Sequence, residues 1–341
     1  MRRVYALFLL LWLLTSCQTN KYPPPSPSAS PEPILPSETI TPMITATLAF
    51  PSETPTLTPV PPTPSTSLRA SPDPREYVVQ TRKASVWDAP ENENKYWNLQ
   101  IELILGEKVL VMERQGEWSK IVAVEQPSSK DPLGYPGWVR SESLTQGWPL
   151  ARQYAVVMVP KSQLRVEPGG ALLMSVYLDT RLPVESTQAD WVQVQLPDGR
   201  SGWLPLGDVR LTDDLSAPIP TDGLFSLAEA LVGVPYRWGG TTTDSLDCSG
   251  FIYRVFHAYG ITLFRDSGDQ ALSGEFVARQ DIKKGDMIFT SGLAGGAISH
   301  VALYWGNGMI LDASGDLGVT VRPLTELLSS NYWITARRYL P

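Results

Sequence analysis

Hydrophobic and polar positions in the last third of the chain follow first a helical spacing and then a strand-like one. After Cys248, apolar and aromatic side chains recur at the spacing of one helix face, and Gly260 closes the run as glycine commonly does after a helix. Further on, apolar runs on both sides of Asn307-Gly308 predict a tight β-hairpin. Residues 220–341 are therefore predicted to mix helices with strands, with Cys248 in the first turn of a buried helix.

The segment between residues 76 and 212 alternates polar and apolar side chains with the period of two that is typical of β-strands. Clear examples are the runs 108–112, 118–124 and 191–196. The segment also repeats itself, since Gly137-Trp138-Val139 is echoed by Gly202-Trp203-Leu204. The pattern predicts two related all-β modules, at 76–147 and 152–212, with most of the repeated tryptophans in their cores.

The N-terminus has the layout of an export signal. Arg2 and Arg3 precede an apolar run, 6–14, that is too short to span a bilayer. The run ends in Leu14-Thr15-Ser16-Cys17, which resembles a bacterial lipoprotein lipobox, in which the cysteine carries lipid; the alternative is an ordinary signal peptide with an incidental cysteine. With 1–17 as signal and lipobox, the protein is predicted to be exported and anchored on the outer side of the membrane.

A Pro/Ser/Thr-rich segment, 18–75, follows the predicted signal and holds about half of the 31 prolines of the chain. Such a composition cannot bury a core and favours polyproline II or disorder. We interpret the segment as a disordered tether between the anchor and the modules; a proline tract that binds protein, or O-glycosylation, is the alternative.

Composition excludes some classes of function. The 341 residues carry a formal charge of −7, which argues against a nucleic-acid partner. The two cysteines and two histidines lack the spacing of a metal site, so neither a metal nor another cofactor is expected. If Cys17 carries lipid, Cys248 has no disulfide partner, and a lone thiol in an exported protein points to a nucleophile.

A nucleophilic thiol needs a base, and the chain has two histidines. His257 lies nine residues after Cys248 on the same predicted helix, so it faces away from the thiol and is assigned a structural or surface role. His300 is therefore the expected base. If the strands pair directly across the Asn-Gly turn, the numbers of opposite residues add up to about 615, which places Asp312 near Leu303. From there Asp312 is within reach of His300 and can orient the imidazole.

Five sequence motifs follow one another in the last domain. They are Tyr236-Arg237-Trp238-Gly239-Gly240, Asp247-Cys248-Ser249-Gly250-Phe251, Arg265-Asp266-Ser267-Gly268-Asp269-Gln270, Lys284-Gly285-Asp286-Met287-Ile288-Phe289 and His300-Val301-Ala302-Leu303-Tyr304. In this order they resemble the NlpC-type family of papain-like cell-wall cysteine peptidases, over essentially all of 222–341. The β modules resemble bacterial SH3-like domains. The resemblance implies an α+β papain-like catalytic domain, 220–341, preceded by two all-β SH3-like barrels.

The same resemblance implies roles for individual residues. Cys248, His300 and Asp312 correspond to the Cys–His–polar triad of the family, in which the third member is most often histidine, so Asp312 is a departure. In γ-D-glutamyl-diamino acid endopeptidases of this type, the matching residues enclose or contact the peptide or its oxyanion. These residues are Tyr135, Tyr236, Asp247, Ser249 and Ser267. The residues themselves leave alternatives open: packing for Tyr135, a helix N-cap for Asp247, a core position for Trp238 and a turn for Asp286.

These observations predict an exported cysteine endopeptidase that hydrolyses peptidoglycan stem peptides. The resemblance favours the bond between D-γ-glutamate and an L-diamino acid, in stems with a free N-terminal L-alanine. Two alternatives stay open. One is a cell-wall-binding protein without catalysis, and the other is an amidase or acyltransferase on the same fold.

Overall fold

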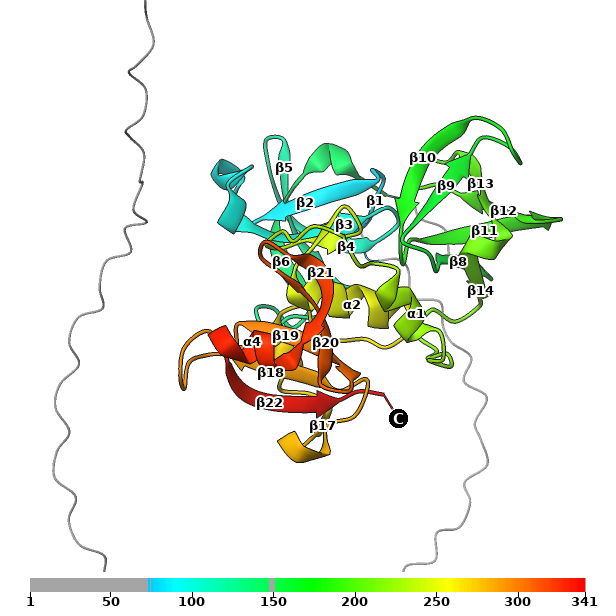
Figure 1. Cartoon of the computed structure of the whole chain (residues 1–341). Helices are drawn as coiled ribbons and strands as arrows, with labels where there is room; N and C mark the ends of the chain where they lie inside the picture. Colours follow the sequence, from blue (N-terminus) through cyan, green and yellow to red (C-terminus); the bar gives the residue numbers. More distant parts are fainter. Residues whose placement is uncertain (1–72, 74, 147–150, 341) are drawn as a thin grey trace, which may run out of the picture. The chain divides into compact units, whose positions relative to one another are not determined.

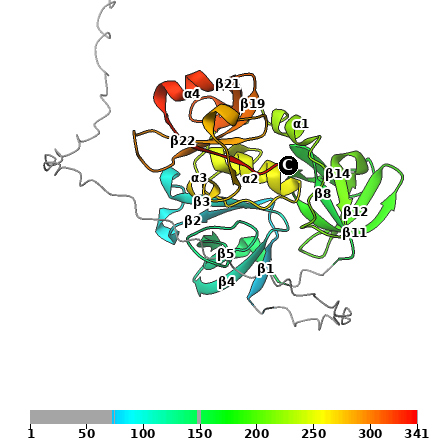
Figure 2. The same ribbon diagram turned by 90° about the horizontal axis from the view of Figure 1, so that it is seen from below.

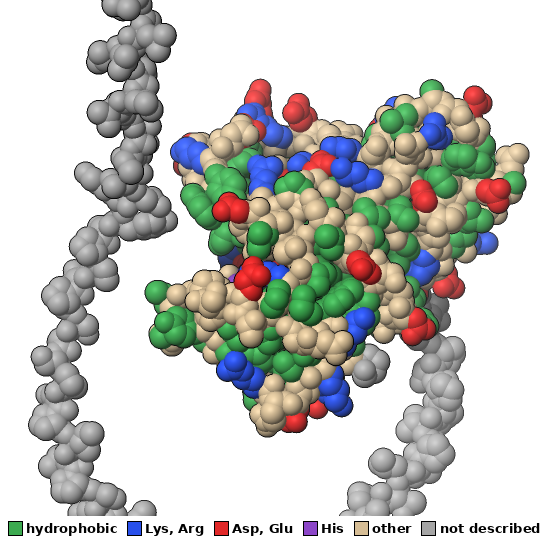
Figure 3. Space-filling model, viewed as in Figure 1, with side chains coloured by type: hydrophobic (Ala, Val, Ile, Leu, Met, Phe, Trp, Pro, Cys, Tyr) green, Lys and Arg blue, Asp and Glu red, His purple; other side chains and the backbone are tan. Residues whose placement is uncertain are grey.

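The computed structural model describes Asp73, residues 75–146 and residues 151–340 (Figure 1). The predicted signal peptide, Cys17 and nearly all of the predicted tether lie outside this range. Within the described residues, no helix is long and apolar enough to cross a membrane. On the face shown in Figure 3, basic and acidic side chains are interspersed.

The first module is an antiparallel sheet of seven strands in the order β3-β2-β6-β5-β4-β1-β7. The strands are β1 (Glu76–Val79), β2 (Lys83–Trp87), β3 (Leu99–Ile104), β4 (Lys108–Gln115), β5 (Trp118–Ala123), β6 (Tyr135–Arg140) and β7 (Leu144–Thr145). Inward-facing side chains such as Val86, Ile101 and Ile121 form its core. The alternation read from the sequence corresponds to this division between an inner and an outer face.

The second module repeats the first. Its order, β10-β9-β13-β12-β11-β8-β14, is that of the first module with every number raised by seven, which confirms the internal repeat. The strands are β8 (Tyr154–Val157), β9 (Lys161–Arg165), β10 (Leu172–Tyr177), β11 (Arg181–Gln188), β12 (Trp191–Gln195), β13 (Ser201–Pro205) and β14 (Val209–Thr212). Short 3-10 turns occur in both modules and in the last domain: Pro90–Asn92, Tyr96–Asn98, Ser141–Ser143, Leu206–Asp208 and Arg279–Asp281.

The tryptophans of the repeat do not lie in the cores as expected. Trp138 and Trp203 are half-buried, because the alternation along each strand turns Val139 and Leu204 inward and the tryptophan beside each outward. Trp118 is also half-buried, and the guanidinium of Arg140 lies 4.3 Å from the centre of its ring. These rings lie toward the outer face of each sheet; in the first module, Lys120 also lies 6.0 Å from the centre of the Trp138 ring.

The last domain packs a buried helix against a six-stranded antiparallel sheet, β17-β22-β18-β19-β20-β21. The helices are α1 (Leu224–Glu229), α2 (Cys248–Ala258), α3 (Ser267–Gln270) and α4 (Leu324–Ser330). The strands are the pair β15 (Thr241–Thr242) and β16 (Ser245–Leu246), then β17 (Glu275–Phe276), β18 (Met287–Ser291), β19 (His300–Gly306), β20 (Met309–Ser314), β21 (Gly318–Pro323) and β22 (Tyr332–Arg338). Every residue of α2 is buried. This α+β arrangement after two SH3-like modules confirms the predicted fold class.

Helix α2 lies between the sheet of the last domain and the first module (Figures 1 and 2). Arg254, on α2, is buried and binds Glu107 of the first module at 2.7 Å and Asp179 of the second at 3.0 Å. His257 also binds Asp179, at 2.6 Å, and is buried. Burial lowers the pKa of His257. His257 is therefore a structural residue at the junction of the modules. Of its two predicted roles, the structural one is confirmed and the surface one is wrong.

Candidate active site

Cys248 lies at the start of a buried helix. Asp247 caps α2 by accepting a hydrogen bond from the Gly250 amide at 2.6 Å, which confirms the N-cap interpretation of Asp247. Glycine is needed at position 250, because a Cβ atom there would lie 2.2 Å from the Gly240 carbonyl oxygen. Cys248 is a free thiol, 6% exposed, at the helix end where the backbone amides favour negative charge.

His300 begins β19 and stands beside this thiol, as elimination of His257 predicted. Its Nε2 binds Asp312 Oδ2 at 2.7 Å, and Cys248 lies near enough to its ring to shift its pKa. Burial acts to lower the pKa of His300, but the negative charge of Cys248 and the hydrogen bond to Asp312 together raise this pKa from 6.5 to about 10. The imidazole therefore carries a proton at neutral pH, as the partner of a thiolate does.

Asp312 reaches His300 through a strand register that differs by one residue from the expected one. Gly306 pairs with Met309, as a sum of 615 requires, but a bulge before Gly306 shifts the pairing so that Leu303 faces Leu311. Asp312 thus lies one residue closer to the His300 end of β19 than predicted. The sequence could not show the bulge, since the Asn-Gly turn specifies only the first pair.

Arg322 is a functional candidate that the sequence reasoning missed. From β21, its Nε donates to Asp312 Oδ1 at 3.0 Å and its Nη2 to Asp312 Oδ2 at 2.6 Å. Burial acts to raise the pKa of Asp312, but the hydrogen bonds from His300 and Arg322 lower it overall. Asp312, which is fully buried, therefore stays ionised and bridges two cations.

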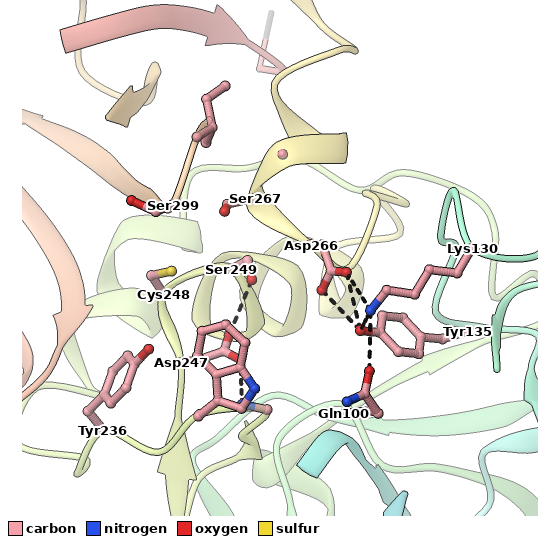
Figure 4. Close-up of a pocket in the computed structure, with 14 residues that line it drawn as sticks. Gln100, Lys130, Tyr135, Tyr236, Asp247, Cys248, Ser249, Asp266, Ser267 and Ser299 are labelled. Atoms are coloured by element: carbon pink, nitrogen blue, oxygen red, sulfur yellow. Dashed lines mark hydrogen bonds and ion pairs between the residues drawn. The ribbon is translucent and has the colours of Figure 1, made fainter. Parts of the chain in front are cut away.

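A cavity of about 380 Å³ opens beside Cys248. Six residues predicted for the site line it: Tyr135, Tyr236, Asp247, Cys248, Ser249 and Ser267. Tyr236 directs its hydroxyl toward Cys248 (Figure 4). Burial and the negative charge of Cys248 raise the pKa of Tyr236, so its hydroxyl keeps its proton and can donate a hydrogen bond.

Asp247 and Ser249 are held by a second buried arginine. Arg265, 1% exposed, donates to Asp247 at 2.7 Å and 3.0 Å and to the Ser249 hydroxyl at 2.9 Å. Asp247 also accepts the Gly239 amide at 2.9 Å. Asp247 and Ser249 are thus held in place in the part of the cavity wall next to Cys248. Ser267, the first residue of α3, also lines the cavity.

The far end of the cavity is built jointly by the first module and the loop before α3. Tyr135, the first residue of β6, points its hydroxyl at the carboxylate of Asp266, with Oη to Oδ2 at 3.2 Å (Figure 4). Lys130 and Gln100 complete this end. The sequence reasoning gave no role to Lys130, Gln100 or Asp266, because each acquires one only when the first module packs against the last domain.

Two further predictions concern residues around the site. Trp238 is 43% exposed and lines the cavity, so the prediction of a core position is wrong: its ring packs edge-on against Trp97 of the first module, with 5.6 Å between the ring centres. Asp286 precedes β18 and binds Arg338 at 2.7 Å and 2.8 Å, in keeping with a structural turn.

The fold and the site together define a class of protein. A thiol at the start of a buried helix, a histidine from a facing strand and a carboxylate on that histidine are the arrangement of a papain-like cysteine hydrolase. No group of His, Cys, Asp or Glu side chains suited to a metal ion occurs in the part of the chain that the structure describes.

Comparison with known proteins narrows this class. The NlpC/P60 family model matches residues 233–338, and the model of the YKFC SH3b2 domain matches residues 157–211. The gamma-D-glutamyl-L-lysine dipeptidyl-peptidase of Bacillus cereus is 34% identical over 73% of this chain and 77% of its own. The protein of the same name from Bacillus subtilis is 34% identical over 70% of this chain and 81% of its own.

A solved structure agrees with these sequence matches. The crystal structure of an NlpC/P60 family protein from Bacillus cereus superposes with a TM-score of 0.72 at 27% identity, covering 78% of this chain and 100% of that one. The chain therefore belongs to the NlpC/P60 family of cysteine peptidases, with SH3-like modules before its catalytic domain.

Proposed function

We propose that this protein is an exported cysteine endopeptidase that hydrolyses peptidoglycan stem peptides between D-γ-glutamate and the L-diamino acid, in stems that keep a free N-terminal L-alanine. The names of the two Bacillus relatives support this bond. The observation that carries the proposal is the form of the cavity, with Cys248 at one end and the carboxylate of Asp266 beside Tyr135 at the other.

In the proposed reaction, Sγ of Cys248 attacks the γ-carbonyl carbon of the glutamate. The backbone amides at the start of α2 and the hydroxyl of Tyr236 stabilise the oxyanion. Nε2 of His300 is bound to Asp312, which leaves Nδ1 to give its proton to the departing amine of the diamino acid. Water then enters, His300 takes its proton, and the thioester at Cys248 is hydrolysed. Asp312 and Arg322 keep the imidazole oriented through both steps.

The first module sets the length of peptide that fits. Tyr135 and Asp266 close the cavity at the end away from Cys248, and both offer oxygen acceptors to a positively charged group. A free N-terminal ammonium can donate hydrogen bonds to these acceptors. An L-alanine that is still linked to a glycan strand through an amide carries no charge, and its glycan needs space beyond the closed end of the cavity. We infer that stems cut free from glycan are the substrates, with Ser267 contacting the peptide along the cavity.

The test is mass spectrometry of the products from purified muropeptides and from the tripeptide L-Ala-γ-D-Glu-L-Lys. Release of the diamino acid by the wild type, and its loss in Cys248→Ala, is the expected result. Full release by Cys248→Ala contradicts the proposed mechanism. Binding to intact wall without any product supports the wall-binding alternative, and cleavage or transfer at another bond supports an amidase or acyltransferase.

Export and anchoring are a separate part of the proposal. They rest on the sequence of residues 1–17, which lie outside the described part of the chain. Metabolic labelling with a fatty-acid precursor should lipidate the wild type and not Cys17→Ala. Equal labelling of both proteins contradicts an anchor on Cys17.

A further inference from the structure

The end of the cavity that lies between the first module and the loop before α3 already holds an ammonium group. This ammonium is the side-chain end of Lys130. Nζ of Lys130 lies 3.1 Å from Asp266 Oδ2 and 3.3 Å from Gln100 Oε1, and it hydrogen-bonds the hydroxyl of Tyr135 (Figure 4). It also lies 4.2 Å from the centre of the Tyr135 ring. Three oxygen acceptors thus surround one ammonium, which has three protons to donate.

The charged side chains that line the cavity can neutralise one cation at this end. Lys130, Asp247 and Asp266 are the charged side chains among its lining residues. The carboxylate of Asp247 is committed to Arg265, Ser249 and two backbone amides. Asp266 is therefore the carboxylate that can neutralise a charge at this end, and in the structure it neutralises Lys130.

The side chain of Lys130 can leave this position while its backbone stays in place. The loop that carries it is fastened to the last domain, since the Ser129 amide donates to Asp269 at 2.9 Å and the Arg265 amide donates to the Pro127 carbonyl at 2.9 Å. The side chain of Lys130 is 43% exposed. Because the side chain is long and partly exposed, a change of rotamer is sufficient to bring its ammonium into solvent without moving the loop.

We propose that Lys130 is a specificity-determining residue that competes with the N-terminal ammonium of the substrate for Asp266 and Tyr135. This inference rests on the proposed function, because it takes the free amino end of the stem as the competing cation. A substrate ammonium displaces Lys130 and restores charge balance at Asp266. An N-acylated peptide leaves Lys130 in place and does not gain the ion pair. Lys130 therefore weakens the preference for free amino termini that the acceptors alone would give.

The test compares Lys130→Met, which keeps the length of the side chain and removes its charge, with Lys120→Met, an exposed lysine of the same module outside the cavity. The substrates are L-Ala-γ-D-Glu-L-Lys and its N-terminally acetylated form. An exposed ion pair corresponds to a factor of about two to five, so Lys130→Met should raise the ratio of kcat/KM for free over acetylated substrate about two- to fivefold. Lys120→Met should keep the wild-type ratio.

A ratio that is unchanged or lower in Lys130→Met overturns the inference, and a lower ratio means that Lys130 assists binding of the free amine. A second measurement is independent of turnover. Calorimetry with the dipeptide L-Ala-γ-D-Glu and its acetylated form, on Cys248→Ala with and without Lys130→Met, should show the same gain in preference. If no tripeptide is cleaved, the proposed function fails, and the calorimetric preference alone supports or overturns the role of Lys130.

Discussion

Asp312 binds two cations, His300 and Arg322, and replacing Asp312 should lower the pKa of His300, whereas replacing Arg322 should not. Asp312 accepts from His300 Nε2 at 2.7 Å and from Arg322 Nη2 at 2.6 Å through the same oxygen, Oδ2. The two cations therefore lie on the order of 5 Å apart, close enough to repel each other through a poorly solvated region. The carboxylate raises the pKa of His300, and by Coulomb's law the positive charge of Arg322 should act in the opposite direction.

Asp312→Asn keeps the shape of the side chain and removes its charge. A hydrogen bond to a charged group contributes about 1.5–3 kcal/mol, and about 1.4 kcal/mol corresponds to one pH unit of pKa. The pKa of His300, about 10 in the wild type, should therefore fall by about one to two pH units. The alkaline limb of kcat/KM should move downward by the same amount, because the imidazolium must supply a proton to the leaving amine.

Arg322→Met removes the opposing charge and leaves Asp312 to His300 alone. The alkaline limb should then stay in place or move upward. Both variants lose an ion pair with a fully buried carboxylate, so each should have a lower Tm in thermal unfolding. Stability therefore falls in both variants, and only the shift of the alkaline limb distinguishes them. An alkaline limb that is unmoved in Asp312→Asn, or that moves downward in both variants, refutes this account of the His300–Asp312–Arg322 arrangement.

Three further predictions concern the oxyanion, the junction of the modules and the helix start. Tyr236→Phe should lower kcat about tenfold or more with a smaller change in KM, since the hydroxyl acts on charge that develops in the transition state; an equal rise in KM with unchanged kcat contradicts this. Arg254→Met removes the ion-pair partner of the buried Glu107 carboxylate and one of the partners of Asp179, so it should lower the free energy of unfolding by about 3–5 kcal/mol in urea. The exposed Arg200→Met should change it by less than about 1 kcal/mol. Gly250→Ala should abolish activity and destabilise the domain, because its Cβ would lie 2.2 Å from the Gly240 carbonyl oxygen; wild-type kinetics would show that the helix start can shift.

Local patterns carried the parts of the prediction that the structure confirms. The helix after Cys248, the Asn-Gly hairpin and the repeat of two β modules each depend on neighbours along the chain, through periodicity and turn residues. The separation of His257 from Cys248 also follows from helical geometry alone. The same reasoning placed the tryptophans of the repeat wrongly, because size and hydrophobicity do not say which face of a strand turns inward.

Tertiary structure decided which distant groups meet. Arg322 reaches Asp312 only because β21 pairs with β20, and a one-residue bulge in β19 sets how Asp312 meets His300. Lys130 and Asp266 lie 136 positions apart in the chain and meet where the first module packs on the last domain. Charge pairs of this kind leave no periodic signal, since their energy depends on distance and burial in space and not on spacing in sequence. The sequence thus determined the reacting thiol and its base, while packing of the domains determined what surrounds them.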